Sequence, residues 1–172
     1  ASLGPDDYWR IVSSGRAVAS YRVTVVAALA ATAFNLVFGL ALAWVLVRYE
    51  FPGRRLLDAI VDLPFALPTA VAGIALTTLF APNGWFGSLL GEMGVTVAYT
   101  QIGIMVAMAF TSLPFIVRTV QPVLEDLDPA LEEAAQSLGG SDRTIFRKVI
   151  LPLLTPELLA GVSLSFARCL GE

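Results

Sequence analysis

The sequence contains no histidine, and Cys169 is its only cysteine. Without histidine, Ser–His catalysis, imidazole metal sites and imidazole proton relays are all excluded. A lone cysteine in an apolar run provides neither a disulfide framework nor a thiolate metal site, so we expect Cys169 to be a buried structural thiol. We therefore predict a chain that has no catalytic residue and no metal site and that binds no cofactor itself.

Charge is scarce as well. Charged residues make up 15% of the 172 residues and hydrophobic residues 56%, whereas soluble domains carry about 25% charged residues. Lys148 is the only lysine, and no basic stripe is interleaved with aromatic residues, so nucleic acid is not an expected partner. Membrane lipid is the solvent that long uncharged runs favour.

The hydrophobic runs predict membrane helices at about residues 23–47, 56–81, 101–123 and 153–172. Such runs are long enough to cross about 30 Å of hydrocarbon. The predicted fold class is therefore all-α, a polytopic transmembrane helical bundle with about four membrane helices in one domain. Because the chain starts at Ala1 and stops inside a hydrophobic run, we expect it to be a fragment of that domain.

The second run contains Pro64 and Pro68 one turn apart, followed by Thr69 and Gly73. Proline frees backbone carbonyls, which a membrane helix tolerates where neighbours or water satisfy them. We expect this helix to be kinked or broken on its cytoplasmic side. These four residues either form part of a transport pathway or gate, or they mark an ordinary kink.

Polar residues inside the other runs carry separate expectations. Arg118, near the inner end of the third run, could meet an anion leaving the membrane, or it could extend to the inner headgroups. Asn35 is expected to face another helix, and Gly39 with Ala43 forms a small-xxx-small pair that lets helices approach closely.

Basic residues indicate the orientation. The turn Arg48–Arg55 (RYEFPGRR) is rich in arginine, and the positive-inside rule places it in the cytoplasm. Segment 82–100 has no lysine or arginine, and we place it on the outer side.

The longest polar excursion runs from Asp128 to Pro152 and predicts coupling helices at about residues 129–150. Asp128 can cap the first helix, which Gly139–Gly140 ends, and Ser141 can cap the second. Leu151–Pro152 is then expected to open a new hydrophobic helix. The excursion is either an ordinary polar loop or a docking surface made of a helix, a glycine hinge and a second helix.

Its spacing favours docking, because it resembles the EAA loop of bacterial ABC importer permeases. That family has isoleucine where this chain has Val149. The resemblance implies that the first helix sits in a groove on a cytoplasmic ATPase subunit. The implied ATPase-coupling residues are Glu133, Ala134, Ala135, Gly139, Val149, Leu151 and Pro152.

Further stretches resemble the T-type membrane subunit of sulfate/thiosulfate ABC importers: AWVLVRYEFPGRRLLDAIVDLPFALPTAVAGIAL, APNGWFG, LPFIVRTVQPVLEDLD and FARCLGE. This implies a non-enzymatic, multi-pass permease of the bacterial cytoplasmic (inner) membrane. Its implied partners are a second permease subunit, two cytoplasmic ATP-binding subunits that carry ATP-Mg, and a periplasmic sulfate-binding protein.

Other functions remain open on the sequence alone. Molybdate permeases share several of these stretches, and Leu170, directly before Gly171–Glu172, resembles the molybdate permeases more than the sulfate permeases. A molybdate or tungstate permease is therefore the first alternative. An ion-coupled secondary carrier is an alternative from another class, as is a membrane-embedded enzyme. Residues 62–69 (DLPFALPT) resemble the sulfate branch more closely.

Overall fold

A computed structural model describes residues 5–172, and all regular structure in that range is helical, which confirms the all-α fold class. The elements are α1 (Pro5–Val12), α2 (Gly15–Arg48), α3 (Arg54–Ala66), α4 (Thr69–Phe80), α5 (Trp85–Glu92), α6 (Gln101–Glu125), α7 (Pro129–Ser137), α8 (Asp142–Ile145), the π-helical turn η1 (Phe146–Ile150) and α9 (Leu151–Leu170).

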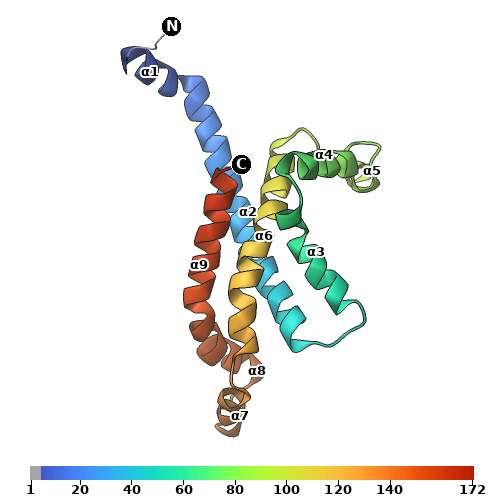
Figure 1. The fold of residues 1–172 in the computed structure, drawn as a ribbon, viewed down its shortest axis with the longest axis vertical. Coiled ribbons are helices and arrows are strands. Elements are labelled where there is room, and N and C mark those ends of the chain that lie inside the picture. The colour runs from blue at the N-terminus through green and yellow to red at the C-terminus, as the bar shows by residue number, and fades with distance from the viewer. Residues whose placement is uncertain (1–4) are drawn as a thin grey trace.

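Helices α2, α6 and α9 pack along one another and form the centre of the molecule, and α3 packs against α6 (Figure 1). Three described stretches are long and apolar enough to cross a membrane: Gly15–Arg48, Gln101–Glu125 and Asp142–Leu170. At about 1.5 Å per residue, each exceeds the 30 Å hydrocarbon thickness. The chain is a polytopic membrane protein.

The predicted second crossing is not one helix. It is divided into α3 and α4, which are bent by 120° relative to each other. The break lies at Leu67 and Pro68, whereas Pro64 lies inside α3. Leu67 is extended (φ −92°, ψ 132°) because a following proline disfavours helical backbone, and Pro68 has no N–H to continue the hydrogen-bond ladder.

The expectation that Leu151–Pro152 opens a helix is confirmed, because α9 begins at Leu151 and has Pro152 in its first turn. The start is not preceded by a break, however, since α8, the wider turn η1 and α9 follow one another as one helical run from Asp142 to Leu170. In that turn the N–H of Leu151 donates to the carbonyl of Phe146, five residues back. An ordinary turn would press the Pro152 ring against the carbonyl four residues earlier, and the wider turn relieves that clash.

A buried polar cluster joins the three central helices. Asn35 of α2 donates to the Ala109 carbonyl (2.9 Å) and to Ser112 Oγ (2.8 Å) of α6. Cys169 of α9 donates through Sγ to the same Ser112 Oγ at 3.2 Å. The predictions that Asn35 faces another helix and that Cys169 is buried are both confirmed.

Small residues allow the helices to approach closely. A Cβ at Gly39 would lie 3.1 Å from Ile116 Cγ2 of α6, and Ala43 is fully buried. A Cβ at Gly161 of α9 would lie 3.2 Å from the Ile116 Cα. The predicted small-xxx-small pair is therefore a packing contact between α2 and α6.

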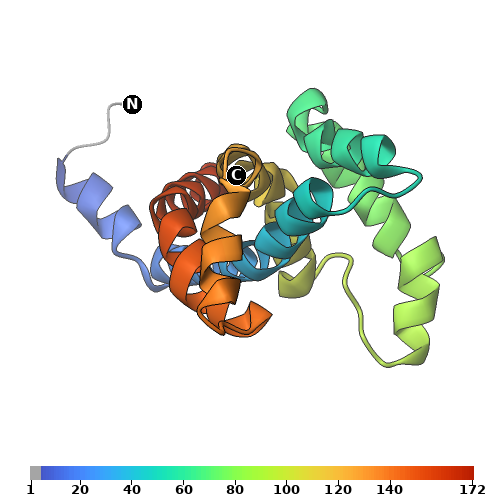
Figure 2. The same cartoon turned by 90° about the horizontal axis from the view of Figure 1, so that it is seen from below.

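The two ends of the bundle differ. One end carries α7, α8, the last turn of α2 and the first turn of α3, whereas α4, α5 and the start of α6 lie toward the other end (Figure 1). Seen along the long axis, α4 and α5 lie to one side of the central helices (Figure 2). The arginine-rich turn 48–55 thus shares an end of the molecule with segment 128–150.

Candidate functional site

Helix α7 is formed by local signals and buries none of its residues. The Asp128 side chain accepts a hydrogen bond from the Ala130 N–H at 2.9 Å, and Pro129 occupies the first turn. Glu132 lies in the same turn, where the helix dipole favours negative charge. The apolar side chains of Leu131 and Leu138 are exposed, the latter by 90%, so this end of the molecule presents uncovered apolar surface.

Two glycines make the hinge between α7 and α8 for different reasons. Gly139 has φ +82°, the left-handed conformation that ends helices. Gly140 instead packs closely, since a Cβ there would lie 2.7 Å from the Ala135 carbonyl oxygen. Ser141 occupies the cap position of α8, but its hydroxyl contacts Thr144 Oγ1 (2.9 Å) instead of capping a backbone N–H. The expectation of a Ser141 side-chain cap is therefore wrong.

The residues expected to contact an ATPase divide into two groups. Ala135, Val149 and Leu151 are partly buried and pack against the hydrophobic core. The exposed members are Glu133, Ala134, Gly139 and Pro152.

A cluster that the sequence did not reveal ties α7 to the end of α2. The guanidinium of Arg48 forms an ion pair with Glu132. It also lies over the Trp44 ring, 5.0 Å from the centroid. Trp44 in turn packs edge-to-face on Phe146 of η1, with 5.4 Å between ring centroids. Arg48 and Glu132 are 84 residues apart, and no local pattern signals such a contact.

The guanidinium of Arg118 in α6 is fully hydrogen-bonded to other side chains and the backbone. It therefore neither extends alone toward the headgroups nor has an N–H available for an anion. Its Nε and one terminal nitrogen donate to the two Asp62 oxygens at 2.8 and 2.7 Å. The other terminal nitrogen donates to Asp58 Oδ1 (2.7 Å) and Gln121 Oε1 (2.6 Å), and a bond to the Asp58 carbonyl (3.1 Å) occupies the fifth N–H. Arg118 therefore joins α6 to α3. The signal that could have shown this is the i,i+4 spacing of Asp58 and Asp62, which places both carboxylates on one face of α3.

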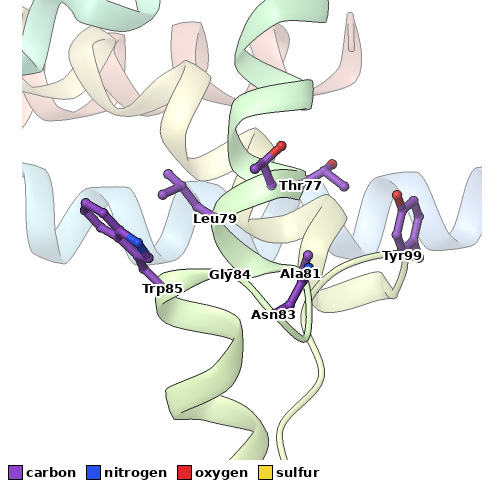
Figure 3. Close-up of a pocket in the computed structure, with 8 residues that line it drawn as sticks. Thr77, Leu79, Ala81, Asn83, Gly84, Trp85 and Tyr99 are labelled. Atoms are coloured by element: carbon purple, nitrogen blue, oxygen red, sulfur yellow. The ribbon is translucent and has the colours of Figure 1, made fainter.

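Two neighbouring cavities lie toward the opposite end of the molecule, each of about 540 Å³. Thr77 and Tyr99 line both. Figure 3 shows the first, with Thr77 on α4, Asn83 and Gly84 on the turn after it, and Trp85 and Tyr99 on opposite sides. Among the described residues, its lining carries hydroxyl, amide and backbone groups but no ionisable acid or base apart from the Tyr99 phenol.

The five predicted pathway residues do not form one site. Gly73 lines the second cavity. Pro64 is partly buried in α3, while Pro68 and Thr69 are exposed at the break before α4. Arg118 lies nearer the α7 end and is held by the carboxylates of α3.

Comparison with known families decides the membership of the chain. Residues 20–172 match the family described as binding-protein-dependent transport system inner membrane component. The chain belongs to this family.

Individual relatives in the family carry more specific names. The chain is 61% identical over 165 residues, 96% of its length, to the sulfate transport system permease protein CysT of Salmonella typhimurium. It is 58% identical over its whole length to the protein of that name from Escherichia coli, and 50% identical to the one from Synechocystis. It covers 60%, 62% and 60% of these relatives respectively, so it spans about three fifths of their length.

Proposed function

We propose that the chain is part of a membrane-spanning permease subunit of an ATP-driven importer that carries sulfate or thiosulfate across the bacterial inner membrane. Identity of 50–61% to proteins named sulfate transport permeases is the observation that carries this proposal. In this proposal ATP-Mg is hydrolysed by two cytoplasmic partner subunits, and a second permease and a periplasmic sulfate-binding protein complete the assembly.

The α7 end supports a docking role. Helix α7 has no fully buried residue, and Leu131 on it and Leu138 directly after it expose apolar surface that is available for a partner. The exposed carboxylate of Glu133 adds a charge for recognition. We assign ATPase coupling to Glu133, Ala134 and Gly139 by direct contact. Ala135, Val149 and Leu151 instead pass motion into the core against which they pack, and Pro152 shapes the turn between them.

The two cavities support an oxyanion as cargo. A doubly charged anion is costly to desolvate. Hydroxyl and backbone groups can replace part of its hydration shell, and they bind it less tightly than a lysine or arginine side chain would. We propose that affinity resides in the binding protein, while the cavity at Thr77, Thr78 and Tyr99 supplies a weakly binding entrance. Gly73 extends this route, and the Pro68–Thr69 break gives α4 freedom to move relative to α3.

An ATP-independent, ion-coupled carrier is the less favoured function. Such carriers place unpaired acids at mid-membrane depth. Asp58 and Asp62 are instead both paired with Arg118. Transport by vesicles that follows an ion gradient and persists without ATP would support the carrier instead.

The deciding experiment is substrate-dependent ATP hydrolysis by the assembled transporter in proteoliposomes. Sulfate, thiosulfate, molybdate and tungstate are each presented with the binding protein. We expect sulfate and thiosulfate to stimulate hydrolysis and to be imported. Stimulation by molybdate or tungstate alone would replace the proposed substrate with that alternative.

A further inference from the structure

Helix α7 is attached to the bundle by few contacts. None of its residues from Pro129 to Ser137 is buried, and its packing neighbours are α8 and η1. Segments with little buried surface reorient easily. If motion of α7 is to reach the membrane helices, the few contacts that fix the orientation of α7 determine which membrane helices move with it.

The Arg48–Glu132 ion pair is one of these contacts, and neighbouring groups hold the Arg48 side chain in position for it. Both side chains are largely shielded, with 27% and 22% of their surface exposed. Arg48 is the last residue of α2, where the helix dipole favours a cation. Stacking over Trp44, which itself packs on Phe146, holds the guanidinium in place.

Resting on the proposed coupling function, we propose that the Arg48–Glu132 pair is a strut through which α7 moves α2 directly. The chain itself already links α7 to α9 through α8 and η1. The strut gives a second route, and α2 is the longest described helix and packs against both α6 and α9. A displacement of α7 therefore acts on all three central helices together.

The adjacent residues Glu132 and Glu133 of α7 have different surroundings, and we assign them different roles. Glu132 is partly buried and faces Arg48, whereas Glu133 is exposed, and its carboxylate forms no bond within residues 5–172. Successive residues of a helix point about 100° apart, so both cannot reach Arg48. Glu132 is the internal strut, and Glu133 is left for a partner. This division supplies a matched control one residue away.

The test uses the full-length permease in the assembled transporter. Five variants are compared with the wild type: Arg48→Glu, Glu132→Arg, Glu133→Arg, and Arg48→Glu combined with either Glu132→Arg or Glu133→Arg. One measurement is the amount of sulfate imported per ATP hydrolysed. The other is amide hydrogen exchange of residues 130–137 in the permease without ATPase, which depends on neither substrate nor docking.

We expect Arg48→Glu and Glu132→Arg each to lower import per ATP by about threefold or more, and to speed α7 exchange by a similar factor. Charge exchange between Arg48 and Glu132 should restore both measurements to within about twofold of wild type. The combination with Glu133→Arg should leave α7 exchange fast. Glu133→Arg alone should lower import per ATP without changing α7 exchange.

Two results would overturn the strut. One is unchanged import per ATP in the single variants despite faster α7 exchange; the other is failure of the charge exchange to restore either measurement. A wild-type assembly that imports another oxyanion instead of sulfate contradicts the proposed substrate alone, because import per ATP is then measured with that oxyanion.

Discussion

Gly139 is the residue on which the shape of the hinge depends. Its φ of +82° costs a side-chain-bearing residue about 1–2 kcal/mol, and asparagine tolerates this conformation best. A Cβ at Gly139 would meet nothing within 4 Å among residues 5–172. A large side chain there therefore leaves the permease intact, and any block must come from a partner that approaches the hinge.

We predict that Gly139→Trp inserts normally into the membrane but imports little substrate while ATP hydrolysis continues. Gly139→Asn should retain most import, since it keeps the backbone conformation with a small side chain. Import and hydrolysis are measured side by side in proteoliposomes. Normal import by Gly139→Trp would disprove docking at the hinge.

Gly39 makes a different demand, because it lies against Ile116 in the interface between α2 and α6. A Cβ there would already lie 3.1 Å from Ile116 Cγ2, so Gly39→Leu should overpack the interface and destabilise the permease by about 1–3 kcal/mol. Thermal unfolding in detergent measures the effect. Gly73→Leu is the control, since a Cβ at Gly73 has open space. Equal unfolding temperatures of the two variants would contradict this contact.

Single-residue features with local causes were predictable from the sequence. The Asp128 cap and the end of α7 at Gly139 follow from the chemistry of neighbouring residues. The pairing of Arg48 with Glu132 was not predictable, because it depends on how α2 and α7 come together across 84 residues. The ion pair of Arg168 with Glu172, four residues along the chain at the end of α9, also has a local cause.

Among the elements, α3 is held to α6 by apolar packing, such as Phe65 on Phe115, and by charge at Arg118, Asp58 and Asp62. Removing the arginine would leave two carboxylates on one face of α3 without their partner, and like charges at that spacing repel.

We predict that Arg118→Gln destabilises the permease by about 1–2 kcal/mol, discounted because the carboxylates are partly exposed. Adding Asp58→Asn and Asp62→Asn should recover part of that loss, since no unpaired charge then remains. Thermal unfolding of the single and triple variants tests this. A triple variant less stable than Arg118→Gln would show that the carboxylates have another essential partner.

The boundaries of α3, α4 and α9 were only partly predictable from the sequence. Proline in the second hydrophobic run predicted a kink or break, but not the 120° bend, because the angle is set by the packing of α3 and α4 against α6. Leu151–Pro152 indicated the start of α9 correctly, but not that a wider turn, η1, would join α9 to α8 without a break. Composition alone does not distinguish these solutions.

At the scale of the whole molecule, the hydrophobic runs were sufficient to predict a polytopic bundle, because uncharged stretches of that length have few other stable environments. How the pathway candidates lie relative to one another could not be predicted from the sequence, because Gly73 lines a cavity toward one end, whereas Arg118 is paired with α3 nearer the other end. What unites the molecule functionally, in our account, is an α7 end that meets a cytoplasmic motor and an opposite end that receives substrate.

That arrangement is tested most directly by cysteine placement at the two ends. Cys169 is fully buried, so a cysteine introduced at Leu138 (90% exposed) or Tyr99 (92% exposed) should dominate thiol labelling of this part of the permease. In intact cells, we predict that a membrane-impermeant thiol reagent labels Tyr99→Cys but not Leu138→Cys. In the assembled transporter, Leu138→Cys should form a cross-link to an ATPase subunit. External labelling of Leu138→Cys, or the absence of any cross-link from it to the ATPase, would contradict the account.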